Sequence, residues 1–251
     1  MNVAVYARGA SAWALREGPL GPAARGAAGV AIGASSMRWE RDRLTVDVDE
    51  RTTPLRGAAR PVRGRIVLHP EARTDLELSI DERGEHRWWP AAPLARIEVD
   101  LPWPGVRFTG HGYYDANAGA RPLESAFESW HWSRARGDGA LLTYDVACAS
   151  GAARSLAFRV SSRGEIDDLE RVHTTPLART LWALERRARV DRGHGGRVVR
   201  TLEDGPFYAR ALVETRLGGR PVLAMHETLA PHRLRRDWVQ RIIGARMRQA
   251  V

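Results

Sequence analysis

The sequence contains no lysine and only one cysteine, and both shortages limit its chemistry. All 39 basic residues are arginine, so Schiff-base formation by a lysine and a lysine general base are excluded. The lone Cys148 forms no intrachain disulfide and supports no cysteine-built metal site. We expect a cytoplasmic protein, because disulfides are rare in that compartment.

Long apolar runs and the common ligand-binding motifs are also missing. No stretch approaches the roughly 20 apolar residues of a membrane-spanning helix. Met1–Tyr6 lacks the basic start and apolar core of a signal peptide, so we expect none. The sequence has no His-Glu-x-x-His pattern, no glycine-rich phosphate loop and no Gly-x-Ser-x-Gly elbow. We therefore expect neither a metal nor a cofactor, and no nucleotide-dependent chemistry.

The charge balance is strongly basic, with a net charge of +9 and a pI near 10.9. Such a balance favours nucleic acid or an anionic membrane as a partner. The arginines are scattered from Arg8 to Arg248 among acidic residues without a basic arm, so we expect no nucleic-acid partner. Residues 233–248 predict a C-terminal helix. Its mixture of arginine with large apolar residues fits a membrane interface, and equally a helix packed on the protein.

Most of the chain reads as short strands separated by turn signals. Leu44, Val46 and Val48, for example, alternate with polar residues and predict one apolar strand face. Each half offers roughly eight strands, the number that a small barrel with room for one ligand needs. We expect strands over residues 2–6, 11–16, 30–32, 36–40, 44–49, 62–69, 76–80, 85–89, 95–101, 106–115, 129–136, 140–147, 155–160, 181–190, 197–202, 207–216 and 221–228.

The segment Pro102-Trp103-Pro104-Gly105 is the best candidate for a domain boundary, because two prolines interrupt a strand ladder. We expect an N-terminal barrel over residues 1–103. A second barrel with the terminal helix is expected over residues 104–251.

The strand that begins the second half has two unlike faces. His111, Tyr113, Asp115 and Asn117 share one face, whereas mostly glycine and alanine occupy the other. This pattern is poor for a core strand and suits a strand that lines a pocket. Aromatic neighbours would desolvate Asp115 and favour its neutral acid form, which is what a general acid requires. Asp115 is therefore the first candidate for catalysis, and Asp145 is a weaker second acid.

Aromatic residues elsewhere leave two interpretations open. His86 and Trp88 share a strand face and either belong to the core or act on a ligand, with His86 orienting an acid and Trp88 offering its π face to a cation. Trp130 and Trp132 also share a face, which is more often barrel core than ligand contact. We name as candidate substrate-binding residues Trp89, Tyr114, Asn117, Trp130, Trp132 and Tyr144.

Taken together, several blocks resemble the carotenoid 1,2-hydratases, also called hydroxyneurosporene synthases. The blocks run in order over nearly the whole chain. The family's chains usually carry further residues before the first block, so a missing N-terminal strand or a misassigned start is expected here. The matching blocks are Asn2-Val-Ala-Val-Tyr6, His86-Arg-Trp-Trp-Pro90, Gly112-Tyr-Tyr-Asp-Ala-Asn-Ala-Gly119, Arg121-Pro-Leu-Glu124, Trp130-His-Trp-Ser-Arg-Ala135 and Thr201-Leu-Glu-Asp-Gly-Pro-Phe-Tyr-Ala-Arg210.

The resemblance implies an all-β fold of two lipocalin-like barrels and a hydro-lyase that needs no cofactor. The implied reaction adds water to the terminal C1=C2 double bond of an acyclic carotenoid such as neurosporene or lycopene. By motif order, the family's active-site residues fall on His86, Trp88, Tyr113 and Asp115. Asp115 would protonate the alkene, Trp88 and Tyr113 would stabilise the tertiary cation, and water would capture it.

Two other functions fit the same scaffold. One is a lipocalin-like carrier that binds an isoprenoid without catalysis, and the other is an enzyme that cyclises or isomerises a polyene. Peripheral association with an anionic membrane on its cytoplasmic face is expected, since the implied substrate resides in bilayers and Trp238 lies in the basic C-terminal stretch. The preferred carotenoid, hydration at one or both ends, and the oligomeric state stay open.

Overall fold

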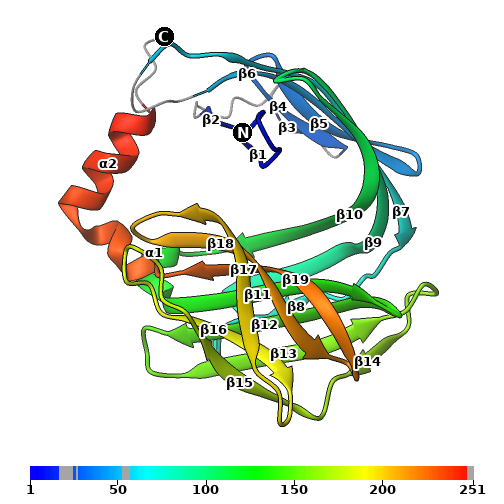
Figure 1. Ribbon diagram of the computed structural model, residues 1–251, viewed down its shortest axis with the longest axis vertical. Helices are drawn as coiled ribbons and strands as arrows, with labels where there is room; N and C mark the ends of the chain where they lie inside the picture. Colours follow the sequence, from blue (N-terminus) through cyan, green and yellow to red (C-terminus); the bar gives the residue numbers. More distant parts are fainter. Residues whose placement is uncertain (17–24, 27, 53–56, 248–251) are drawn as a thin grey trace. The chain divides into compact units, whose positions relative to one another are not determined.

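The computed structural model describes residues 1–16, 25–26, 28–52 and 57–247. It consists almost entirely of strands, with a short helix at the C-terminus, which confirms the all-β prediction (Figure 1). Contacts divide the chain into two compact units. Unit 1 comprises Met1–Glu71, Ala95–Tyr113 and Arg241–Val251, and unit 2 comprises Ala72–Leu94 and Tyr114–Gln240.

Two sheets hold the strands of the N-terminal half. The first is the pair β1 (Asn2–Val5) and β2 (Ala12–Leu15). The second has the order β10-β9-β7-β6-β5-β4-β3, and β8 also pairs with β9. Its strands are β3 (Arg25–Gly26), β4 (Gly29–Ile32), β5 (Ser35–Glu40), β6 (Arg43–Arg51), β7 (Pro61–Ala72), β8 (Leu78–Ser79), β9 (His86–Trp103) and β10 (Val106–Gly119).

Unit 2 is built around one large antiparallel sheet with the order β14-β13-β12-β11-β19-β18-β17, and a separate pair, β15-β16. Its helical segments are α1 (Leu123–Ala126), η2 (Pro231–Arg235) and the start of α2 (Asp237–Met247). Its strands are β11 (Phe127–Gly137), β12 (Gly139–Cys148), β13 (Ala153–Val160), β14 (Ile166–Asp168), β15 (Val172–Leu177), β16 (Arg186–Asp191), β17 (Gly196–Asp204), β18 (Tyr208–Leu217) and β19 (Arg220–Leu229).

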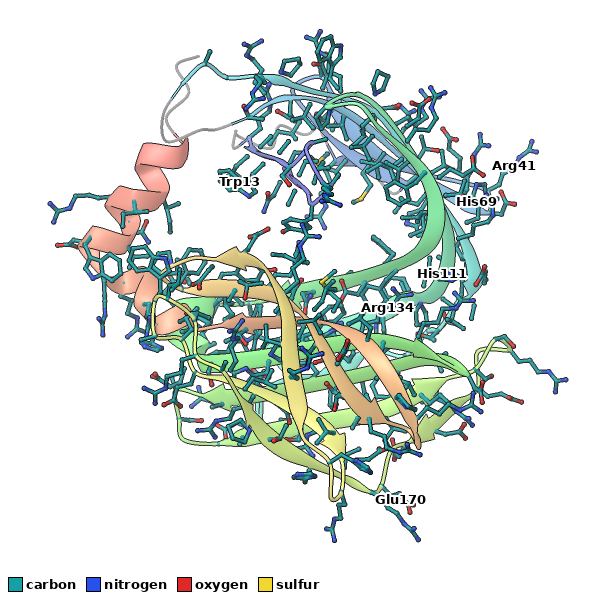
Figure 2. All side chains as sticks on the ribbon, viewed as in Figure 1. Trp13, Arg41, His69, His111, Arg134 and Glu170 are labelled. Atoms are coloured by element: carbon teal, nitrogen blue, oxygen red, sulfur yellow. The ribbon has the colours of Figure 1, made fainter. Side chains whose placement is uncertain are left out.

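Strand alternation builds the core of each unit. Leu44 and Val48 on β6 are buried, as their spacing predicts. In unit 1, Val48 packs in a cluster with Val62 and Leu101. In unit 2, β15 and β16 pack on β18 through a cluster of Leu177, Ala188, Val190, Ala211 and Val213. The pair β15-β16 therefore covers part of one face of the large sheet. Figure 2 draws the side chains on the ribbon.

The prediction of separate strands at residues 85–89 and 95–101 is wrong, because β9 runs unbroken from His86 to Trp103. Pro90 and Pro93 lie inside it. Proline fixes φ at a value that an extended strand tolerates, and only its missing N–H group counts against it. Residues 102–105 lie where β9 turns into its neighbour β10, with Gly105 at a φ of 91°. The division into barrels at residue 103 stays a prediction, and contacts group the chain differently.

Three further details differ from expectation. The strands β3, β14 and β15 and the single-turn α1 were not predicted. The strand expected over residues 181–190 begins only at Arg186, because the backbone before it forms a turn with Ala183 at a φ of 55°. The C-terminal helix was predicted, although η2 and α2 divide it. Among the helices of the described residues, none is long and apolar enough to cross a membrane.

Candidate active site

The two faces of β11 carry different chemistry. Trp130 and Trp132 point to one side of the sheet, and His131 and Ser133 point to the other. The strand lies between β12 and β19, and Trp132 is paired with Tyr144 on one side and with Glu227 on the other. We call the side of Trp130, Trp132 and Tyr144 the aromatic face, and the side of His131, Ser133 and His226 the histidine face.

A carboxyl group is held at the aromatic face by an indole. Trp88 on β9 has no exposed surface, and its Nε1–H donates to Asp115 Oδ2 at 2.8 Å. The Trp88 ring contacts Tyr144 and Phe158, with ring centroids 4.9 and 5.8 Å apart. The two residues singled out most strongly by the sequence, Trp88 and Asp115, are thus bonded to each other.

The aromatic cluster continues along β11. Trp130 contacts Tyr144 and Phe127, with ring centroids 6.1 and 6.2 Å apart. Burial raises the pKa of the Tyr144 hydroxyl far above its ordinary value, and the negative charges of Asp115 and Glu227 raise it further. Tyr144 therefore keeps its proton, and its hydroxyl is available as a hydrogen-bond donor.

His86 is engaged at both ring nitrogens. Nδ1 lies 3.0 Å from Asp81 Oδ2, and Nε2 lies 3.0 Å from the carbonyl oxygen of Arg121. Burial raises the pKa of Asp81, but hydrogen bonds from His86 outweigh it, and the net pKa is lowered. A carboxylate and a carbonyl oxygen are both hydrogen-bond acceptors, so each ring nitrogen of His86 lies against an acceptor. These partners take the place of the expected bond from His86 to the catalytic acid.

The His86 ring is also held by packing. Its edge meets Phe127 with ring centroids 4.8 Å apart and an interplanar angle of 70°. A Cβ atom at Gly119 would lie 2.5 Å from His86 Cδ2, so the end of β10 approaches the ring as only glycine allows. His86 therefore fixes the start of β9, two residues before Trp88.

The other predicted residues are placed unevenly. Trp89 points away from Trp88, is 39% exposed and donates to the carbonyl of Thr74 at 2.7 Å. Tyr114 is half-buried on the alternate face of β10, and Asn117 is exposed. Tyr113 precedes Asp115 by two residues and belongs to unit 1. The residues that unit 2 brings together are Trp88, Asp115, Trp130, Trp132 and Tyr144.

Sequence reasoning missed two charged elements. Asp81 falls between two expected strands and was not named as a site residue, yet the turn that contains it folds it back onto His86. Glu227 was not named either, yet it lies on the face of Trp132, where Arg210 donates to it from two nitrogens at 2.9 and 2.8 Å. The alternation of β19 would have placed Glu227 on that face. No local signal gives the long-range partner of Asp81.

The histidine face contains a hydrogen-bonded chain of four side chains. Ser133 Oγ lies 2.8 Å from His226 Nδ1, and His226 Nε2 lies 3.1 Å from Thr228 Oγ1. Thr228 Oγ1 in turn lies 3.2 Å from His131 Nδ1. Burial lowers the pKa of His226 to about 3, helped by His131 and Arg186. This face therefore keeps His226 neutral.

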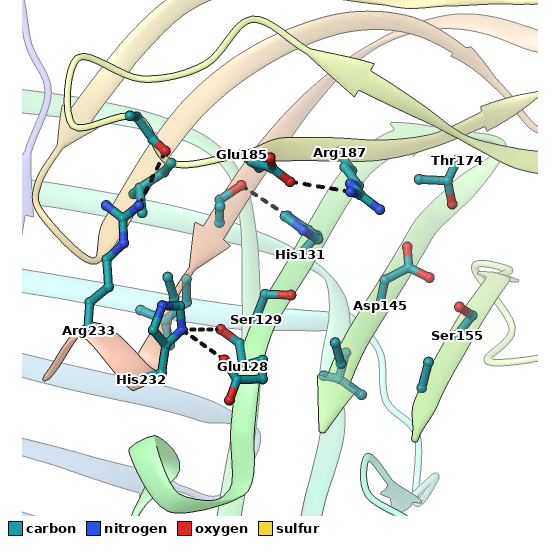
Figure 3. A pocket seen from close by; sticks show the side chains of 18 residues that line it. Glu128, Ser129, His131, Asp145, Ser155, Thr174, Glu185, Arg187, His232 and Arg233 are labelled. Atoms are coloured by element: carbon teal, nitrogen blue, oxygen red, sulfur yellow. Dashed lines mark hydrogen bonds and ion pairs between the residues drawn. The ribbon is translucent and has the colours of Figure 1, made fainter. Parts of the chain in front are cut away.

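A cavity of about 590 Å³ opens beside this chain (Figure 3). His131 lines it, and burial lowers the pKa of His131 to about 4, with Arg187 adding to the effect and Asp145 opposing it. Asp145, the weaker acid candidate, is bound by Arg189 at 2.8 Å. The second carboxylate is therefore ion-paired on the face opposite Trp88 and Asp115.

Among the described residues, no cluster of three or more His, Cys, Asp or Glu side chains is arranged to hold a metal ion. The geometry that remains is a carboxyl group bonded to an indole within an aromatic cluster. The family model for the carotenoid hydratase CrtC matches residues 1–250. The chain belongs to the carotenoid hydratase CrtC family. The resemblance noted from the sequence blocks is thereby confirmed.

Individual relatives agree with this assignment. An acyclic carotenoid 1,2-hydratase from Thiocapsa roseopersicina is 40% identical over 249 residues, covering 98% of this chain and 61% of its own length. One from Cereibacter sphaeroides is 38% identical over 217 residues, covering 86% of this chain and 77% of its own. The chain thus spans about three fifths of the Thiocapsa relative.

The fold has a solved counterpart. A crystal structure described as an AttH protein from Nitrosomonas europaea aligns with a TM-score of 0.51 at 14% identity, covering 82% of this chain and 70% of that one. At this identity the likeness concerns the fold alone. It supports a β-rich, lipocalin-like class for this member of the CrtC family.

Proposed function

We propose that this chain hydrates the terminal C1=C2 double bond of an acyclic carotenoid of the neurosporene or lycopene type without a cofactor. The relatives named acyclic carotenoid 1,2-hydratase support the substrate class. The observation that carries the chemistry is the hydrogen bond from Trp88 Nε1–H to Asp115 Oδ2. It fixes one carboxyl oxygen and directs the other, as the acid O–H, toward a reacting carbon.

The reaction balances with water alone. Asp115 gives its proton to C2, and the electron pair of the double bond forms the new C–H bond, which leaves a tertiary cation at C1. Water attacks C1, and the proton released from the bound water returns to the Asp115 carboxylate. The product is a 1-hydroxy carotenoid, and the acid is regenerated.

Stabilisation of the cation falls to the aromatic residues. The π faces of Trp88 and Tyr113 carry negative potential, which attracts a positive carbon. Trp88 is completely buried against Tyr144 and Phe158, so the end of the polyene enters only when this cluster opens. His86, with both nitrogens engaged, acts as a positioning residue that keeps Trp88 in reach of Asp115.

Product analysis tests the proposal directly. The chain is expressed in cells that accumulate lycopene, and extracted pigment is examined by mass spectrometry for the gain of one water. Hydrated pigment with the native chain and none with Asp115→Asn is the expected result. Tight pigment binding without any hydrated product would favour the carrier instead, and a cyclised or isomerised product of unchanged mass would favour the third function.

The expected partners belong to the same proposal. The substrate is an apolar polyene that resides in a bilayer, and the second reactant is water. A cytoplasmic location with peripheral association with an anionic membrane follows from that substrate and from the basic charge of the chain. Cell fractionation that finds the chain in the soluble fraction at all salt concentrations would contradict the membrane part.

A further inference from the structure

The loop between β15 and β16 exposes large apolar side chains. Leu181 is 96% exposed and Trp182 is 40% exposed. Single exposed apolar residues are common on protein surfaces, but a leucine almost wholly in water beside an exposed tryptophan is a concentrated apolar feature. The sequence pattern had assigned both residues to a strand, which would have given them sheet neighbours.

Hydrogen bonds from the backbone N–H groups of the loop hold it in this conformation. The N–H of Leu181 donates to Asp204 Oδ2 at 2.8 Å, and the N–H of Ala183 donates to the carbonyl of Thr180 at 3.0 Å. The N–H of Leu184 donates to Thr180 Oγ1 at 3.1 Å. Ala183 adopts a φ of 55°, a backbone conformation that residues other than glycine seldom adopt. Exposure of Leu181 is therefore a fixed property of the turn.

Helix α2 adds a third apolar side chain. Trp238, in its first turn, is 38% exposed and stacks on Trp182 with ring centroids 5.7 Å apart and an interplanar angle of 17°. We call Leu181, Trp182 and Trp238 the apolar tip. Tryptophan is enriched at membrane interfaces, because its ring is apolar and its N–H group is polar.

Three arginines adjoin the apolar tip, beside the acidic Asp204 and Asp237. Arg233 donates to the carbonyl oxygens of Trp182 at 2.8 Å, Ala183 at 3.3 Å and Pro206 at 3.1 Å, so these bonds leave its charge uncompensated. Arg235 and Arg236 follow it and are exposed. The parts of the chain that the structure describes contain no ion pair to either of these two. By contrast, the nearby acidic Glu185 is neutralised by Arg179 and Arg187.

We propose that the apolar tip and Arg233, Arg235 and Arg236 form a surface that docks on an anionic lipid bilayer. Three projecting side chains are too few for a stable protein–protein interface, which buries roughly 1,200 to 2,000 Å². They suit insertion into the boundary of headgroups and acyl chains, while the arginines face lipid phosphates. A bilayer therefore fits better than a second protein. This surface rests on the membrane association proposed above and specifies where it occurs, whereas it does not depend on the hydration chemistry.

Vesicle sedimentation tests the docking surface with the full chain. Vesicles of phosphatidylcholine alone are compared with vesicles that also contain phosphatidylglycerol. The native chain is expected to sediment with the anionic vesicles and not with the neutral ones. The double variant Leu181→Ser/Trp182→Ser loses the apolar area that would insert into the bilayer. Its partition coefficient into anionic vesicles should fall by about tenfold or more. The matched control is Leu223→Ser, an exposed leucine on β19, which should bind as the native chain does.

A second pair of variants tests the charge. Arg235→Gln with Arg236→Gln should weaken binding by roughly tenfold and flatten its dependence on salt. Arg192→Gln, at the far end of β16 from the loop, is the control and should change neither. Equal sedimentation of the Leu181/Trp182 variant and its control would overturn the proposal. The proposal would also be overturned if the native chain sedimented with neither kind of vesicle and analytical ultracentrifugation showed that it self-associates through the apolar tip.

Discussion

The aromatic and histidine faces of β11 are built from alternate residues of one strand, and they carry different ionisable groups in different protonation states. On the aromatic face, Asp115 is bonded to an indole, and the carboxylate of Glu227 is bound by Arg210. On the histidine face, His131 and His226 are kept neutral by burial. One side thus holds acidic groups among rings, and the other keeps its buried histidines uncharged beside the Asp145–Arg189 ion pair. The difference separates a candidate reaction centre from a structural network.

Replacing one acid on each face should give the largest difference in hydration rate between two variants. Asp115→Asn keeps size and removes the proton donor, so hydration should fall by about a thousandfold, in the range general acids contribute. Asp145→Asn on the opposite face should leave turnover within a few-fold and weaken only the ion pair with Arg189. Rates are measured on lycopene in detergent micelles, with bound pigment determined separately. Equal losses in the two variants would erase the distinction between the faces.

The indole that holds the acid gives the next largest effect. Trp88→Phe keeps a ring but removes the donor to Asp115. Asp115 becomes a carboxylate as its proton leaves, and a hydrogen bond to a charged group is worth about 1.5 to 3 kcal/mol. Its loss corresponds to a fall of about 10- to 100-fold in kcat. Trp89→Phe is the control, because its N–H bonds the carbonyl of Thr74 instead. A Trp88→Phe enzyme with native kcat would show that the bond does not position the acid.

The Asp81–His86 pair should show a smaller effect on turnover. Asp81→Asn removes the carboxylate that is bonded to His86 Nδ1, so the ring loses that partner and its fixed orientation. We expect a fall of roughly tenfold in kcat with little change in KM, together with a loss of about 1 to 3 kcal/mol in the free energy of unfolding. Asp81→Glu should restore part of both. Nitrogen chemical shifts of the His86 ring report its hydrogen bonding directly, and unchanged shifts in Asp81→Asn would contradict this interpretation.

The histidine face should affect stability rather than turnover. The folded-state pKa values of His131 and His226, about 4 and about 3, lie below the ordinary 6.5. The unfolded state therefore binds more protons below pH 6.5, and stability falls as pH drops toward 4, by up to about 1.4 kcal/mol per pH unit for each histidine. Urea unfolding at pH 7 and pH 5 measures this.

The double variant His131→Gln with His226→Gln separates these histidines from other groups. Its stability should depend less steeply on pH between 7 and 5 than that of the native chain. The lowered pKa of Asp81 acts in the same direction, but only in a window below about pH 4. Identical slopes for the two proteins would mean that the buried histidines do not govern acid stability.

Much of the fold was accessible from alternation and turn chemistry. Period-two patterns located nearly every strand of the large sheet, because one face of each is buried. Pro90 and Pro93 misled the prediction at β9, since their extended φ is compatible with a continuous strand. The loop of Leu181 and Trp182 was misassigned because its apolar composition is that of a strand. Nothing local encodes the positive φ of Ala183.

The candidate site was only partly accessible. Asp115 stood out through its aromatic neighbours, and Trp88 through its strand face, but their bond joins residues 27 positions apart. Tyr144 and Trp130 were named as candidates, and the structure brings both to the site. The partners of His86 were not accessible, because one is a turn carboxylate and the other is the main-chain carbonyl of Arg121, which no residue pattern marks.

The reaction rate of the single cysteine reports how often the structure around it opens locally. Cys148 ends β12, is 6% exposed, and has a thiol pKa raised by burial. The residue pairs with Phe127 on β11, and its thiol lies against the backbone of Glu82. A thiol reagent therefore reaches it only when these neighbours move aside, and each molecule reacts once. The same strand carries Tyr144, four residues earlier. The rate of Cys148 alkylation, measured with and without a bound polyene, would therefore report the local opening of the sheet that supports the aromatic face.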